Sequence, residues 1–251
     1  MSHARPPAVP SAPAALLSPR RRPGRLAIVL LALFGLAGVA GGGTGLYLEL
    51  TRGATRPEVA AALREEIATR WQRLPSGTIF PATVSYATNA GLVVEAHRVG
   101  IAPTAPCAAA LDPAAVKLLR PQGCRVVLRA TFVDSSSTVV STVGVAVMPS
   151  ASAAATAARD FVRTSPRGGV MAVAFPGTPA RLFRNAQRVW FYATAVGPYA
   201  VLATAGYTSG PYRHRVISPA VFSGLGVDFG SQVTAALART ATPCRGEDIR
   251  C

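Results

Sequence analysis

Histidine is the residue best suited to acid–base chemistry near neutral pH, and three histidines are widely spaced in this sequence. His3 lies near the N-terminus, His97 at the end of a predicted strand and His214 within a Tyr-Arg-His-Arg segment. A histidine-dependent hydrolase needs a nucleophile and an orienting acid close to its histidine. The stretch 206–210 resembles a nucleophile elbow, but its serine is misplaced relative to the glycines. We therefore interpret His97 and His214 as exposed loop residues.

The acidic residues offer no catalytic pair that stands out. Asp112 precedes a proline where a helix is expected to begin, and Asp134 begins a predicted turn. A glycosidase pair, such as Glu95 with Asp134 or Asp160, would be close only in space, so the sequence leaves this alternative open. The sequence contains no phosphate-binding loop, dinucleotide fingerprint or calcium loop. We assign no catalytic residue and expect no cofactor.

Aromatic and basic side chains gather in a segment that follows a predicted hairpin. The segment contains Tyr207, Tyr212, Arg213, His214 and Arg215. Tyrosine and arginine are favoured anchors at protein interfaces. These five residues are therefore the candidate contact surface.

An uncharged apolar stretch from Leu26 to Leu48 sets the topology of the chain. As a helix it would be about 34 Å long, enough to cross a hydrocarbon core of about 30 Å. Arginines crowd its N-terminal flank, whereas its C-terminal flank carries both signs of charge, which predicts a cytoplasmic N-terminus. The alternative is a cleaved signal peptide, whose apolar core is usually only about 7 to 15 residues long.

Glycines within this stretch suggest a self-association face. Gly38 and Gly42 form a small-xxx-small pair, which lets a second membrane helix approach closely. The alternative explanation is that glycine is common in membrane helices.

All four cysteines follow the apolar stretch: Cys107, Cys124, Cys244 and Cys251. They allow three pairings, and the pairing of Cys107 with Cys124 and of Cys244 with Cys251 closes the shortest loops. Outside the cytoplasm, disulfides are the expected state of these cysteines. Their spacing lacks the closely spaced pairs of a zinc site, so we expect two disulfides and no metal.

The composition favours anionic partners but not nucleic acid. The 251 residues carry a net charge of +15, and every basic residue except Lys117 is arginine. This charge would attract anionic wall polymers or lipid head groups. The arginines after the apolar stretch are scattered without interleaved aromatic residues, unlike those of single-strand nucleic-acid binders. The arginine and alanine content is also typical of a GC-rich genome.

Local patterns predict alternating hairpins and helices after the apolar stretch. Apolar spacing and caps predict helices over 56–74, 112–119 and 149–163, and a last helix over 228–239. Alternation and turn residues predict strands over 78–87, 92–99, 124–133, 138–148, 187–196 and 199–207. The strand 124–133 alternates clearly, so we expect it to be half-buried. The region 164–186 shows no clear pattern.

Two of these strands resemble each other. Five of nine positions are identical between Arg125–Val133 and Arg188–Val196, and each strand is followed by a turn, a second strand and a helix. We therefore expect an α+β fold, an antiparallel sheet of hairpins with helices on one face, after one transmembrane helix. A repeated strand-strand-helix unit is one hypothesis, and coincidence in an Ala/Val/Arg-rich chain is the other.

The expected organisation has five parts: a disordered cytoplasmic tail (1–25), a transmembrane helix (26–48), a juxtamembrane helix or stalk (49–77), an extracytoplasmic domain (78–243) and a cysteine-containing tail (244–251). This layout and composition resemble the single-pass envelope proteins of high-GC Gram-positive bacteria. The resemblance implies the plasma membrane as location and identifies no activity.

The leading hypothesis is a membrane-anchored, non-enzymatic binding or scaffold domain that engages an envelope protein or an anionic wall polymer. The alternatives are a wall- or polymer-modifying hydrolase, and an extracytoplasmic sensor or lipid-binding domain with an apolar cavity.

Overall fold

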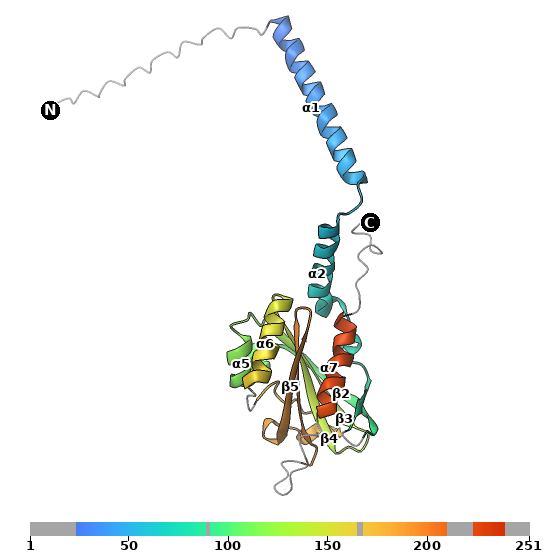
Figure 1. The fold of residues 1–251 in the computed structure, drawn as a ribbon, viewed down its shortest axis with the longest axis vertical. Coiled ribbons are helices and arrows are strands. Elements are labelled where there is room, and N and C mark those ends of the chain that lie inside the picture. Colours follow the sequence, from blue (N-terminus) through green and yellow to red (C-terminus); the bar gives the residue numbers. More distant parts are fainter. Residues whose placement is uncertain (1–23, 89–90, 165–167, 210–222, 239–251) are drawn as a thin grey trace, which may run out of the picture. The chain divides into compact units, whose positions relative to one another are not determined.

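The computed structural model describes residues 24–88, 91–164, 168–209 and 223–238 (Figure 1). The chain divides into two compact units, one ending at Gly53 and the other beginning at Ala54.

The first unit contains the helix α1 (Arg25–Thr51), which confirms a helix over the apolar stretch. Its side chains are exposed along its whole length, and its mean hydropathy reaches 2.2. Its length and composition suit both a membrane-spanning anchor and a signal sequence.

The second unit begins with α2 (Arg56–Arg73), which confirms the helix predicted over 56–74. Pro57 occupies the first turn, and the Glu58 carboxylate accepts a hydrogen bond from the Thr55 backbone N–H at 2.7 Å. Near its C-terminal end, Ile67 and Trp71 pack against the main core. Those contacts hold α2 on the domain.

Six strands form one antiparallel sheet in the order β1-β2-β3-β4-β6-β5, which confirms the predicted antiparallel α+β fold. The strands are β1 (Thr83–Ala87), β2 (Val93–Pro106), β3 (Val126–Asp134), β4 (Val139–Val147), β5 (Arg188–Val196) and β6 (Tyr199–Tyr207). The sheet curls so that both of its edge strands, β1 and β5, contact one helix, α7 (Ser223–Ala238).

Two predicted strand boundaries are wrong. The segment 78–82, predicted as strand, begins within the short helix α3 (Ser76–Ile79), where Ile79 and Phe80 are fully buried. The strand predicted to end at Val99 continues to Pro106, because an irregularity between Ala102 and Ala105 leaves Pro103 outside the ladder.

Helices cover both faces of the sheet, so the prediction of helices on one face is wrong. The side chains of Val201 and Ala203 on β6 alternate with those of Ala200 and Leu202, and the two pairs belong to different cores. The first core contains α2 and α7, and the second contains α4 (Cys107–Ala110), α5 (Pro113–Leu119) and α6 (Ala151–Thr164). In Figure 1, α6 and α7 flank β5 on opposite sides.

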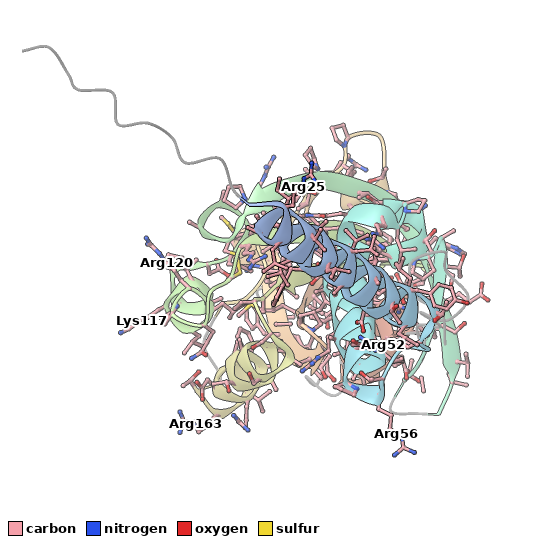
Figure 2. All side chains as sticks on the ribbon, turned by 90° about the horizontal axis from the view of Figure 1, so that it is seen from above. Arg25, Arg52, Arg56, Lys117, Arg120 and Arg163 are labelled. Atoms are coloured by element: carbon pink, nitrogen blue, oxygen red, sulfur yellow. A yellow bond between two sulfur atoms is a disulfide. The ribbon has the colours of Figure 1, made fainter. Side chains whose placement is uncertain are left out.

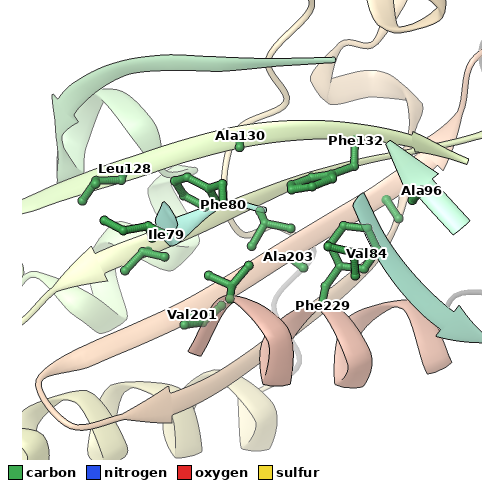
Figure 3. Packing of buried hydrophobic residues seen from close by; sticks show 14 of the residues in the cluster. Ile79, Phe80, Val84, Ala96, Leu128, Ala130, Phe132, Val201, Ala203 and Phe229 are labelled. Carbon is green, nitrogen blue, oxygen red and sulfur yellow. The ribbon is translucent and has the colours of Figure 1, made fainter. Parts of the chain in front are cut away.

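Close helix–sheet approach shapes the first core. Phe229 of α7 meets Phe132 of β3 edge-to-face, with ring centroids 4.8 Å apart (Figure 3). A Cβ atom on Gly226 would come within 1.9 Å of the Trp190 ring, so only glycine permits α7 to lie this close to β5.

An irregular segment, residues 168–187, covers part of the second face. It includes two short 3-10 turns, η1 (Pro179–Leu182) and η2 (Asn185–Gln187). Val170 lies over Gly144 of β4, and Phe175 lies over Gly100 of β2. Most of β3 is therefore buried on both faces, which corrects the prediction of a half-buried strand.

The hairpins β3–β4 and β5–β6 meet at the centre of the sheet, where Thr142 lies opposite Thr204. Thr131 lies opposite Thr142 in the first hairpin, but Phe191, not Thr194, lies opposite Thr204 in the second. The residues aligned in sequence thus occupy different registers. In addition, α6 and α7 pack on opposite faces, so these observations do not support a repeated unit.

A buried ion pair holds the segment 168–187 in place. Asp112 occupies the N-cap position of α5, but its carboxylate binds the Arg188 guanidinium and the Gly169 N–H instead of capping the helix. Burial raises the pKa of Asp112, but the hydrogen bonds from Arg188 and Gly169 and the charge of Arg188 outweigh it. The pKa therefore lies below its ordinary value.

We predict that Arg188→Met lowers the free energy of unfolding by about 3 kcal/mol near neutral pH, because it leaves a buried carboxylate unpaired. The depressed pKa makes the stabilisation by Asp112 complete above its unfolded-state pKa of about 3.9, and this stabilisation is lost as the pH falls through the folded-state value. Urea unfolding of the full-length protein in detergent, at neutral and at acidic pH, measures both effects.

The matched control is Asp112→Asn combined with Arg188→Met, which should recover part of the loss near neutral pH and equal the single variant in acid. Equal stability of wild type and Arg188→Met at neutral pH would contradict the assignment.

Cys107 and Cys124 form a disulfide across a sequence separation of 17 residues. This bridge is one of the two in the pairing that closes the shortest loops. The bridge joins the end of β2 to the start of β3 around α4 and α5. Cys244 and Cys251 lie outside the described residues.

We expect Cys107→Ala combined with Cys124→Ala to lower the free energy of unfolding by about 3 kcal/mol, because the loop becomes unconstrained in the unfolded chain. Urea unfolding without reductant measures the change. Non-reducing digestion and mass spectrometry of the wild type must yield the two cysteine peptides linked to each other, and peptides linked in another pairing would refute the bridge.

Candidate functional site

The structure buries one member of the candidate contact surface. The side chain of Tyr207 is only 5% exposed and belongs to the first core, so its prediction as a surface residue is wrong. Its position on β6 follows the alternation of Val201, Ala203 and Ala205, which all face that core. Tyr212, Arg213, His214 and Arg215 lie outside the described residues.

The residues considered for hydrolysis are not brought together. His97 Nδ1 lies 3.3 Å from Thr83 Oγ1 on the neighbouring strand. The carboxylate of Asp134 accepts hydrogen bonds from the backbone of its own turn, and it shares a sheet face with Ala96, whereas Glu95 points to the other face. Asp160 pairs with Arg163 on α6, at 3.1 Å.

The two edges of the sheet differ in how far they are occupied. At the β1 edge, the Ala87 N–H donates to Asp228 Oδ2 at 2.8 Å, and Gln232 Nε2 donates to the Ser85 carbonyl at 2.7 Å. Two side chains of α7 therefore occupy backbone groups that a new strand would need.

In the part of the chain that the structure describes, the outer edge of β5 has no strand beside it. A two-residue turn, Gly197-Pro198, joins β5 to β6, and Gly197 has the positive φ of +48° that such a turn requires. Val196 and Tyr199 form the closing pair of this turn. The closing pair of a two-residue hairpin exchanges hydrogen bonds, so alternate residues of β5, counted from Val196, direct their N–H and C=O groups away from β6. These residues include the half-buried Ala195 and also Ala193, which is only 5% exposed beneath α6, and no described hydrogen bond engages their outward groups.

A shallow groove of about 520 Å³ runs along this edge, between α6 and β5. We call it the α6–β5 groove, and its lining includes Arg159, Val162 and Arg163 of α6 with Ala193, Thr194 and Ala195 of β5. The apolar side chain of Val162 is 59% exposed beside it. The groove therefore combines an open strand edge, apolar surface and two arginines.

Basic side chains extend beyond the groove. Figure 2 shows Lys117 of α5, Arg120 just after α5 and Arg163 of α6 pointing outward. Since α5 and α6 are in contact, these cations add to one positive region of the surface.

Two other hollows lack an open strand edge. One, of about 560 Å³, lies between α2 and the start of α6 and includes Arg64, Ile67 and Ser150. The Oγ of Ser150 already accepts a hydrogen bond from the Ala153 N–H at 3.1 Å. The other, of about 610 Å³, is an open surface beside Lys117 on α5.

Within the described ranges, no group of three or more His, Cys, Asp or Glu residues is arranged to hold a metal ion. Comparisons with protein-family models, with curated proteins and with solved structures find no match for the chain.

One cation lies away from the groove and lacks a partner among the described residues. Arg129 projects from β3 on the same face as Val127 and Thr131, and its Nε atom is buried without a hydrogen bond. Burial lowers the pKa of its guanidinium. No described hydrogen bond therefore offsets the burial of this Nε–H donor.

We predict that Arg129→Met raises the free energy of unfolding by about 1 kcal/mol, because it removes an unsatisfied buried donor and keeps much of the apolar stem. Urea unfolding of the full-length protein in detergent gives the value. Arg125→Met, at an exposed position just before the same strand, is the matched control and should change little. A large loss of stability in Arg129→Met would show that the guanidinium makes a stabilising contact.

Proposed function

We propose that the protein is a membrane-anchored, non-enzymatic binding or scaffold domain that engages another protein of the cell envelope. In this proposal α1 is retained as the anchor, the N-terminus is cytoplasmic, and the unit that begins at Ala54 is extracytoplasmic. The arginines before α1 support this orientation through the positive-inside bias. The Cys107–Cys124 disulfide supports an oxidising compartment for the domain.

One observation carries the binding proposal: among the described residues, no hydrogen bond engages the outer edge of β5 beside a groove, whereas side chains of α7 engage the β1 edge. An exposed strand edge is a template for pairing with another chain, and native proteins usually block it. A partner that adds a strand gains hydrogen bonds along the backbone and side-chain pockets beside it.

We expect a photo-crosslinking amino acid in place of Val162 to capture a discrete partner protein in intact cells that express the full-length chain. The matched control replaces Val93, an apolar residue of β2 that is 74% exposed and lies outside the groove. Purification under denaturing conditions and mass spectrometry identify the product.

Ala195→Pro removes an outward N–H from the open edge, so this substitution should also abolish the Val162 product. Thermal unfolding of the Ala195→Pro protein checks that the domain still folds. The same products from Val162 and Val93, or a Val162 product that persists in folded Ala195→Pro, would contradict binding at the β5 edge.

A further inference from the structure

We infer that the α6–β5 groove receives an extended acidic segment of a partner protein, which pairs with β5 as an additional strand. This inference rests on the proposed function and names the chemistry of the segment that the domain binds.

The backbone of β5 sets the first requirement for the occupant. Outward N–H and C=O groups occur at every second residue of β5 and so repeat at about 6.7 Å along the strand. Of these residues, Ala195 is half-buried, whereas Ala193 is only 5% exposed, so the added strand first meets Ala195. An extended peptide carries donors and acceptors at the same repeat. Sugar polymers and lipid head groups lack this repeat of alternating donors and acceptors, so a peptide matches the edge best.

The arginines of α6 set the second requirement. Arg159 and Arg163 are exposed and lie one helical turn apart, which separates them by about 6 Å along the helix axis. Side chains on one side of an added strand repeat at about 6.7 Å. Two acidic residues at alternate positions would therefore meet the two arginines.

The charges around the groove favour an acidic segment. Asp160 pairs with Arg163 at 3.1 Å and offsets part of its charge, while the Arg159 guanidinium donates to the neutral Thr156 Oγ at 3.1 Å. Lys117 on the adjoining α5 and Arg120, which directly follows α5, are also exposed. The groove thus keeps a positive balance beside the open edge.

The other side of an added strand would face the aromatic side of β5. Trp190 and Tyr192 stack there with ring centroids 5.8 Å apart, and both side chains are half-buried. Apolar side chains suit this surface. The recognised segment therefore alternates acidic and apolar residues.

The test uses the full-length protein in phosphatidylcholine nanodiscs and a fluorescent peptide of alternating valine and glutamate. Fluorescence anisotropy measures the Kd. We expect binding to weaken about tenfold in Arg159→Gln combined with Arg163→Gln, through the loss of two exposed charge pairs. Lys117→Gln combined with Arg120→Gln removes the same charge outside the groove and should weaken binding much less, because salt screens these more distant charges.

A second peptide, N-methylated at every other residue, separates strand pairing from charge attraction. It keeps the glutamates but loses the N–H groups that would pair with β5, so it should bind much more weakly. Equal affinity for the two peptides would overturn the inference. So would an equal loss of peptide affinity in the Arg159→Gln/Arg163→Gln variant and in the Lys117→Gln/Arg120→Gln variant.

The remaining outcomes distinguish the source of a negative result. The protein could bind phosphatidylglycerol vesicles in a way that requires Arg159 and Arg163, and yet not bind the peptide. This result would assign the groove to an anionic lipid surface and overturn the peptide inference. A Val162 crosslink that requires the β5 edge, together with no binding of the acidic peptide, would overturn the acidic preference and leave the proposed function standing. If neither the Val162 crosslink nor binding of the acidic peptide is observed, the proposed function and the peptide inference are both refuted.

Discussion

The ion pair between Asp112 and Arg188 is the contact on which the second face of the sheet depends. It joins the start of α5 to the start of β5, and the same carboxylate holds the Gly169 N–H. The segment after Gly169 then crosses the sheet over Gly144 and Gly100. Farther along, the Thr131 hydroxyl donates to the Val173 carbonyl and the Thr142 hydroxyl accepts from the Val173 N–H, so the segment stays on the sheet and shields apolar residues of its central strands from water.

The parts of the fold that the sequence predicts well are those with local causes. Alternation and the Gly197-Pro198 turn define the β5–β6 hairpin, and Pro57 with Glu58 marks the start of α2. The covering segment 168–187 could not be predicted, because its position depends on contacts with Asp112 and with glycines distant in the chain. The strand order is equally non-local, so neither edge can be recognised from the residues of β1 or β5.

The candidate site shows the same division. Side chains alternate along β6, so Tyr207 faces the same core as Ala205, and this alternation could have predicted its burial. Tyrosine is also common at protein interfaces, and the prediction of an exposed contact residue followed that preference instead. Arg159 and Arg163 fall on the exposed side of a helix whose apolar residues include Phe161. Their sequence spacing predicts that they are neighbours, while only the fold brings them beside an open strand.

The pairing of β4 with β6 has a consequence for how the chain must fold. Thr142 and Thr204 meet at the centre of the sheet but are far apart in sequence, so the pairing carries the slow loop closure of a non-local contact. The chain is synthesised from its N-terminus, so β3 and β4 can form their hairpin before β6 has been made. During that interval β4, which is buried at every position in the finished domain, is an apolar edge strand. The time between the two hairpins is therefore the period of greatest aggregation risk.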